Sequence, residues 1–188
     1  MPLLMLLYIP TWKQYKDLSS KLLMIALFFA FVGDVSLMLI AKNEHLFLLG
    51  LGAFMVTQLL YIFIFSRAVY AFKTLFQPTW LFVLFLFGTI YILLMNSLFD
   101  QLKDLLIPVL IYGAVVCTMG FTSTVRNVNK SSYLLVLFGA CFFIVSDALI
   151  AINKFLYQGE LYLAQPNIMI LYVMAQYFIV VGLIKAHK

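Results

Sequence analysis

The chain has 188 residues, a net charge of +5 and a mean hydropathy of +1.09, with 65% hydrophobic and only 10% charged residues. A soluble domain of this length has no core large enough to hide so much apolar surface, so the composition excludes a soluble globular protein. No polar stretch is long enough for a separate module, and the basic residues are scattered over short loops, which argues against nucleic-acid binding. We therefore predict a single integral membrane domain over residues 1–188.

The opening residues 2–9 are apolar, but this stretch ends at Pro10 and is too short to cross a membrane. It also lacks the basic start and the cleavage site of a signal peptide. We expect a partial N-terminal helix: either a short interfacial piece, or the remainder of a hydrophobic hairpin whose earlier half is absent from this sequence.

Six further stretches reach the 17 to 25 or so mainly apolar residues that a helix needs to cross the hydrocarbon core. Polar or charged residues separate them, which predicts an all-α, polytopic transmembrane helix bundle with six full spans. The stretches are 20–41, 46–66, 80–98, 105–125, 132–152 and 167–184.

The basic residues are divided unequally between the two ends of these spans. Nine fall on one side and three on the other, and positively charged loops stay in the cytoplasm. The C-terminus is therefore predicted to be cytoplasmic, in a multi-pass protein of the cell membrane. The larger group is Lys13, Lys16, Lys21, Arg67, Lys73, Arg126, Lys130, Lys185 and Lys188, and the smaller is Lys42, Lys103 and Lys154.

Two aspartates lie inside predicted spans, Asp34 in 20–41 and Asp147 in 132–152. Both spans run from inside to outside in the predicted orientation. At 1.5 Å per residue, Asp34 lies about 10 Å and Asp147 about 8 Å before the outer end of its span, so similar depths are expected. The surrounding segments FVGDVSL and FIVSDAL fit a parallel internal repeat, although chance similarity between two apolar helices explains them equally well.

An ionisable residue in a membrane helix costs at least about 2.5 to 3.5 kcal/mol on insertion scales, so it normally faces a bundle interior or a wet cavity. Asp34 and Asp147 are therefore the predicted catalytic residues. Two carboxylates can carry out acid-base hydrolysis without a cofactor, because one donates a proton while the other, ionised, stabilises a cation or orients water. The structural alternative is a pair of aspartates hydrogen-bonded to helix ends or to a tyrosine. Metal ligation has no support, since His45 and His187 lie in a loop and at the terminus.

Polar side chains on the other spans are predicted to bind the substrate in the same cavity. Gln58 and Tyr61 are three residues apart, and Tyr172 and Gln176 are four apart, so each pair shares one face of its helix. Interhelical hydrogen bonds and an aromatic belt at the membrane surface explain any one of them equally well. The predicted substrate-binding residues are Gln58, Tyr61, Tyr112, Asn153, Lys154, Tyr172 and Gln176.

Lys154 follows Asp147 by seven residues, nearly two helical turns, so we expect it on the same face and nearer the outer surface. There it either meets a lipid phosphate or extends to the headgroups for structural reasons alone. Gly50 and Gly52 are expected to form a close-packing surface between helices, not a phosphate-binding loop, because no strand precedes them.

Several short motifs, in this order along nearly the whole chain, resemble the YhhN family of membrane proteins, which includes the animal lysoplasmalogenases. They are Pro2-Leu3-Leu4-Met5, Gly33-Asp34, Gly50-Leu51-Gly52-Ala53-Phe54 followed by Tyr61, Pro108 with Tyr112, Gly139-Ala140, Ser146-Asp147, Asn153-Lys154-Phe155, and Tyr172 with Gln176.

The resemblance implies an eight-helix bundle in which the Pro-Leu stretch opens the second helix, and thus a first helix missing from this sequence. It also implies hydrolysis of the vinyl ether bond of a lysophospholipid substrate, a lysoplasmalogen, to a fatty aldehyde and a glycerophospho-headgroup. Asp147 is favoured as the acid. Gln58 stands where many relatives have His, which puts a proton-relay role at that position in doubt.

Two other functions remain open on the sequence alone. The same buried aspartates fit a proton-coupled carrier or flippase for a lipid or small molecule, which would move its substrate without breaking a bond. A structural or regulatory bundle would need the aspartates only for stability. The sequence does not indicate an oligomeric state.

Overall fold

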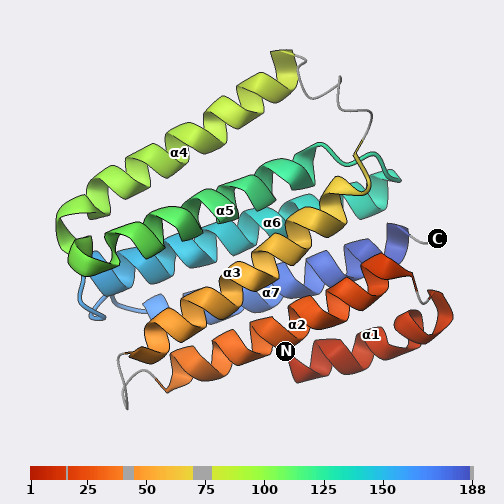
Figure 1. Ribbon diagram of the computed structural model, residues 1–188, viewed down its shortest axis with the longest axis horizontal. Helices are drawn as coiled ribbons and strands as arrows, with labels where there is room; N and C mark the ends of the chain where they lie inside the picture. Colours follow the sequence, from red (N-terminus) through yellow and green to blue (C-terminus); the bar gives the residue numbers. More distant parts are fainter. Residues whose placement is uncertain (16, 40–44, 70–77, 187–188) are drawn as a thin grey trace.

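The structure, a computed structural model, describes residues 1–15, 17–39, 45–69 and 78–186, and most of these are helical. A 3-10 turn, Lys103–Leu105, joins the fourth helix to the fifth, and a π-helical turn, Ile152–Leu156, extends the sixth. The α-helices, shown in Figure 1, are α1 (Pro2–Tyr15), α2 (Leu18–Met38), α3 (His45–Ser66), α4 (Pro78–Leu102), α5 (Leu106–Thr124), α6 (Lys130–Ala151) and α7 (Ala164–Ala186).

Five segments of the described chain are long and apolar enough to cross a membrane. One of them, Trp80–Thr124, contains two helices, because α4 and α5 turn back on each other at Lys103, where φ is +43°. Each of the six predicted stretches therefore corresponds to one of the helices α2 to α7. The protein is a multi-pass, all-α integral membrane protein.

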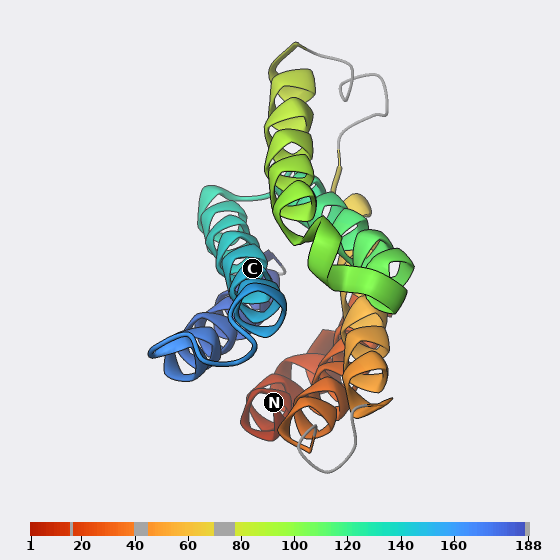
Figure 2. The same cartoon turned by 90° about the vertical axis from the view of Figure 1, so that its left-hand side faces the viewer.

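Helices α6 and α7 form a closely packed hairpin (Figure 2). A Cβ atom on Gly139 would lie 2.9 Å from the carbonyl oxygen of Ala175 and 3.0 Å from the backbone nitrogen of Ile179. A Cβ atom on Gly182 would lie 3.0 Å from the backbone nitrogen of Val136. One glycine on each helix thus lets the two backbones approach, as small residues do between membrane helices.

Helices α2 and α3 form the second hairpin, and the glycines of α3 differ in their roles. A Cβ atom on Gly50 would lie 2.9 Å from Leu37 Cδ2 of α2, whereas one on Gly52 would meet nothing within 4 Å. The expectation that both glycines form a packing surface is therefore wrong for Gly52. Two residues along a helix are about 200° apart, so both cannot face α2.

Helix α1 differs from the sequence prediction, because it continues through Pro10 to Tyr15 instead of ending at the proline. It packs on α2 and α7, and Tyr8 is buried between these helices and the core. Proline removes one backbone hydrogen bond, but contacts with neighbouring helices can keep a membrane helix continuous across the proline.

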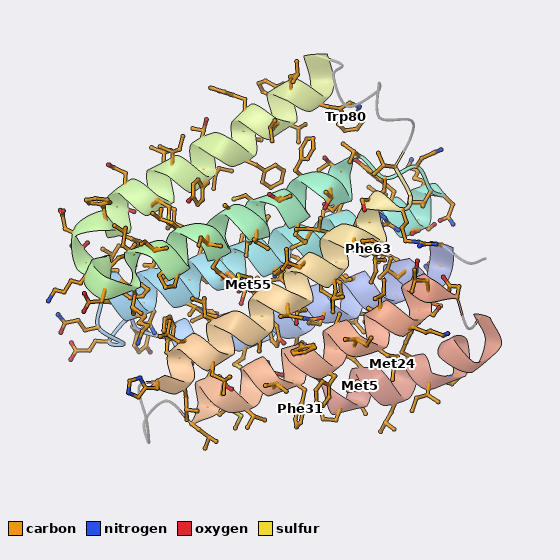
Figure 3. The ribbon with its side chains drawn as sticks, viewed as in Figure 1. Met5, Met24, Phe31, Met55, Phe63 and Trp80 are labelled. Carbon is orange, nitrogen blue, oxygen red and sulfur yellow. The ribbon has the colours of Figure 1, made fainter. Side chains whose placement is uncertain are left out.

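Helix α4 packs on α5 and, near its C-terminal end, on the π-helical turn Ile152–Leu156, whereas its N-terminal end stands away from the rest of the bundle (Figure 2). Its free side exposes large apolar side chains, among them Phe82, Phe85 and Ile92. Trp80, at the start of α4, lies far from the helices that enclose the core (Figure 3). These features are typical of a helix that faces lipid.

Arg126, between α5 and α6, is 5% exposed and connects the ends of three helices. Its guanidinium donates to Ser132 Oγ at 3.2 Å and lies 5.4 Å from the ring centre of Phe65 on α3. Burial lowers the pKa of Arg126 to about 10, so the group stays charged at neutral pH.

Arg126→Gln is expected to lower the free energy of unfolding by about 1 to 3 kcal/mol, because a buried charged hydrogen bond and a cation–π contact are lost. Lys130→Gln, which removes an exposed charge from the same end of the bundle, is the matched control. The measurement is the thermal unfolding midpoint in detergent, and equal midpoints for the two variants would contradict this role.

Candidate functional site

Asp34 and Asp147 occupy equivalent places on α2 and α6. Asp34 lies four residues before Met38, the last residue of α2, and Asp147 lies four residues before Ala151, the last residue of α6. The two helices run in the same direction (Figure 1). The structure therefore places both carboxylates at a similar height, toward the end of the bundle at which α4 turns into α5.

Both aspartates line one cavity of about 580 Å³. Side chains of α2, α3, α6 and α7 form its wall, together with the first two residues of the chain. The wall is mainly apolar with a few polar groups, as in most sites that bind small molecules. The polar side chains that line the cavity are Asp34, Asp147, Asn153, Lys154, Gln158, Gln165 and Tyr172.

The cavity reaches the outer surface of the bundle beside α2. Phe31, Val35 and Met38 line it and are 37%, 39% and 78% exposed. Phe31 projects from α2 toward the outside, next to α1 (Figure 3). Met169 of α7 also lines the cavity and is 54% exposed. Because these helices are membrane spans, this part of the cavity borders the lipid phase.

Asp147 is held by Tyr112 of α5, whose hydroxyl donates a hydrogen bond of 2.7 Å to Asp147 Oδ2. The two residues also line a smaller cavity of about 50 Å³, which shares Leu37, Phe47 and Phe54 with the larger one. The hydrogen bond fixes the orientation of the carboxyl group and leaves Oδ1 without this constraint. Gln58 of α3 lies near the same tyrosine but makes no hydrogen bond of regular geometry with it.

Asp34 is partly buried beside Tyr172 of α7, and the nitrogen of Met1 lies 3.9 Å from Asp34 Oδ2. The Tyr172 hydroxyl interacts with both aspartates, although it makes no hydrogen bond of regular geometry. Phe54 packs edge-to-face on Tyr172, with ring centres 5.6 Å apart. Gly33 makes room for this ring, because a Cβ atom there would lie 2.8 Å from it.

Four of the predicted substrate-binding residues lie outside the larger cavity, and one of them, Tyr112, lines the smaller cavity instead. Tyr61 donates a hydrogen bond to Gln176 Oε1, and this pair and Gln58 are fully buried between α3 and α7. Both polar atoms of the Gln58 amide and the nitrogen of Gln176 have no hydrogen-bond partner among the described residues. These groups form a buried polar layer next to the site. Of the two pairs predicted to share a helix face, Gln58 with Tyr61 and Tyr172 with Gln176, only Tyr172 lines the larger cavity.

Asn153 and Lys154 lie in the π-helical turn at the end of α6, and both line the cavity. Asn153 Oδ1 accepts a hydrogen bond from the Leu161 nitrogen at 3.1 Å, and its backbone oxygen accepts one from Gly159 at 2.8 Å. Lys154 Nζ lies 4.3 Å from the ring centre of Phe47. Asn153 thus shapes the rim of the cavity, whereas Lys154 presents a charge at it.

Sequence reasoning missed that two phenylalanines of α3, Phe47 and Phe54, line the cavity together with the aspartates. In an all-apolar helix, the sequence does not distinguish an aromatic residue that lines a site from one that faces lipid or the core. His45, predicted to lie in a loop, begins α3, and His187 lies outside the described residues. In the part of the chain that the structure describes, no group of three or more His, Cys, Asp or Glu residues could hold a metal ion.

The chain was compared with protein families, with curated proteins and with solved structures. The family model described as the YhhN family matches residues 1–183. No curated protein and no solved structure matches the chain. Because the matched range includes both aspartates and every helix of the bundle except the last turn of α7, the chain belongs to the YhhN family.

Proposed function

We propose that this protein is a membrane-embedded hydrolase that cleaves the vinyl ether bond of lysoplasmalogen-type lysolipids. The observation that carries the proposal is that Asp34 and Asp147, on two different helices, line one largely apolar cavity. The cavity borders the lipid phase, which suits an amphipathic substrate. Membership of the YhhN family is consistent with this function.

The reaction needs an acid, a stabilised cation and one water molecule. A carboxylic acid protonates the alkene carbon remote from the ether oxygen, and the alkene electrons then form an oxocarbenium ion at the carbon next to that oxygen. Water adds to this cation and loses a proton, which gives a hemiacetal and restores the acid. The hemiacetal then breaks its carbon–oxygen bond to the glycerol, and the products are a fatty aldehyde and the glycerophospho-headgroup. An acid and an ionised carboxylate are sufficient for this sequence.

The surroundings of the two aspartates support different roles for them. Asp147 is oriented by Tyr112 through Oδ2, so we assign it as the acid, with its proton on Oδ1. Asp34 is the ionised carboxylate that stabilises the oxocarbenium ion. Tyr172 lies within electrostatic range of both carboxylates and has the capacity to hydrogen-bond the attacking water.

Charge distribution supports an orientation in the cell membrane with the C-terminus in the cytoplasm. The described basic residues Lys21, Arg67, Arg126, Lys130 and Lys185 lie at or near the helix ends on one side, and Lys103 and Lys154 lie at the other. The more basic side is expected in the cytoplasm. The cavity then opens in the outer half of the membrane.

The test is turnover by the purified chain in lipid nanodiscs. We expect equal amounts of aldehyde and glycerophospho-headgroup from a 1-alkenyl lysophospholipid, and no cleavage of the matching 1-acyl and 1-alkyl lipids, which lack the vinyl ether. Movement of the intact lipid across proteoliposomes, dependent on pH and without aldehyde release, would instead identify a carrier and overturn the proposal.

Tyr112→Phe is expected to lower the turnover number by about tenfold, because Asp147 loses the hydrogen bond that orients it. Tyr91→Phe is the matched control, since its hydroxyl donates to the carbonyl oxygen of Leu110 between α4 and α5, outside the cavity. The turnover number of both variants is measured as aldehyde release. A Tyr112→Phe variant as active as Tyr91→Phe would show that this hydrogen bond does not serve the reaction.

A further inference from the structure

Lys154 presents a cation at the rim of the cavity that contains the two aspartates. Its Nζ lies 4.3 Å from the ring centre of Phe47 and 5.9 Å from that of Phe155. Among the described residues, its ammonium group forms no ion pair with a carboxylate. Two aromatic rings therefore hold a positive charge that remains available to an anionic ligand.

The backbone around Lys154 is fixed in an unusual conformation. The π-helical turn Ile152–Leu156 ends α6, and such turns are frequent at functional sites. Asn153, which is 5% exposed, binds the nitrogens of Gly159 and Leu161 and so ties the following loop to the end of α6. Gln158 and Gly159 of this loop line the cavity as well. Lys154 thus lies in a segment whose backbone is held by hydrogen bonds, and not at a frayed helix end.

The spacing of Asp147 and Lys154 matches the spacing of two groups in a lysophospholipid. Seven residues correspond to about 10 Å along an α-helix. Five bonds separate the vinyl ether oxygen from the phosphorus of a 1-alkenyl glycerophospholipid, which is about 6 Å when the chain is extended. A hydrogen bond of about 3 Å from the ammonium to a phosphate oxygen closes the remaining distance.

We propose that Lys154 binds the phosphate group of the lipid headgroup and thereby selects phosphate-bearing lysolipids over neutral ether glycerols. The assignment rests on the proposed function for the location of the reacting bond, and it deepens that function by naming the residue that recognises the headgroup phosphate. The ammonium exchanges its contact with Phe47 for a charge-assisted hydrogen bond to phosphate, which is the stronger interaction. The alkyl chain extends toward the lipid-facing side of the cavity.

Binding of lipids that the enzyme cannot cleave tests this assignment separately from catalysis. The two ligands are a 1-alkyl glycerophosphocholine and the corresponding 1-alkyl glycerol, measured with the full chain in nanodiscs. Lys154→Gln is expected to weaken binding of the phospholipid by about tenfold to a hundredfold and binding of the neutral lipid by less than about twofold. Lys154→Arg, which keeps the charge, is expected to restore most of the affinity.

Lys103→Gln is the control, because this exposed lysine lies at the same end of the bundle but outside the cavity. Equal weakening of both ligands by Lys154→Gln, unchanged phospholipid binding, or the same loss in Lys103→Gln would each overturn the assignment. Glycerophosphocholine and inorganic phosphate are expected to compete only weakly, and competition as strong as that of the lipid would show a site for free phosphate instead.

Failure of the proposed phosphate site can be distinguished from failure of the proposed hydrolase activity. If the wild-type protein binds the phosphorylated lipid through Lys154 but releases no aldehyde from a vinyl ether, the hydrolase proposal fails and the phosphate site stands. If aldehyde is released equally well from alkenyl glycerol and alkenyl lysophospholipid, with and without Lys154, the hydrolase stands and the phosphate site fails.

Discussion

Replacing Asp147 with asparagine is expected to lower the rate of aldehyde release from a lysoplasmalogen by about 10²- to 10⁴-fold. Asparagine has nearly the same size, and its amide oxygen can still accept the hydrogen bond from Tyr112. It has no acidic proton to transfer to the alkene carbon, so the first step of the reaction is lost while the packing around α6 is preserved. Aldehyde release under single-turnover conditions measures the chemical step directly.

Asp34→Asn is expected to have an effect of similar size for a different reason. The variant keeps the side chain beside Tyr172 but removes the negative charge that stabilises the oxocarbenium ion, and losses of about 10²- to 10³-fold are typical when such an electrostatic contact is removed. Substrate binding should change little, because the uncharged ground state of the vinyl ether does not need the carboxylate. The expected signature is a lower kcat at a nearly constant KM.

Asp100→Asn is the matched control for both aspartate variants, because Asp100 is an exposed aspartate on α4 that does not line the cavity. All three proteins should have the unfolding midpoint of the wild-type chain to within the error of the measurement. If correctly inserted Asp34→Asn and Asp147→Asn variants turned over the substrate as fast as Asp100→Asn, the catalytic assignment would be wrong.

Gly139→Ala is expected to destabilise the protein by about 1 to 3 kcal/mol, although it adds a single methyl group. The new Cβ atom would lie 2.9 Å from the carbonyl oxygen of Ala175 and 3.0 Å from the nitrogen of Ile179, so α6 and α7 must separate. Backbone atoms cannot rotate away as the end of a flexible side chain can. Gly139→Leu should be more destabilising still.

Gly52→Ala is the control, since a Cβ atom there meets nothing within 4 Å and alanine favours a helix over glycine. Its unfolding midpoint should equal or exceed that of the wild type. Separation of α6 from α7 should also move Asp147 relative to Tyr172 and reduce turnover. Equal midpoints for Gly139→Ala and Gly52→Ala would show that the close approach of the two backbones is not needed for stability.

The sequence by itself determined the helices, because hydropathy over a 20-residue window is a local property. The break between the predicted stretches 80–98 and 105–125 is found as the turn at Lys103–Leu105, where polar residues interrupt the apolar run. The aspartates could be singled out for the same reason, since a carboxylate in an apolar helix is costly wherever that helix packs. Pro10 misled the prediction because its local effect on the helix was outweighed by contacts with other helices.

The tertiary structure alone decided which faces of the helices meet. Apolar residues surround these helices on all sides, so the sequence has no periodicity that separates a lipid-facing side from a core-facing side. Gly50 and Gly52 are indistinguishable in the sequence, yet only Gly50 contacts α2. Tyr112 and Asp147 are 35 residues apart, and their hydrogen bond depends on how α5 and α6 rotate against each other.

The shared cavity of Asp34 and Asp147 is the largest consequence of this packing. Their similar depth follows from counting residues along two parallel helices, but their convergence on one space does not. That convergence depends on close contacts made by single small residues, Gly33 against Phe54 and Gly139 against α7, whose effect is set by atoms far away in the chain. Local hydropathy therefore identified the reactive groups, and non-local packing of the helices brought them to one site.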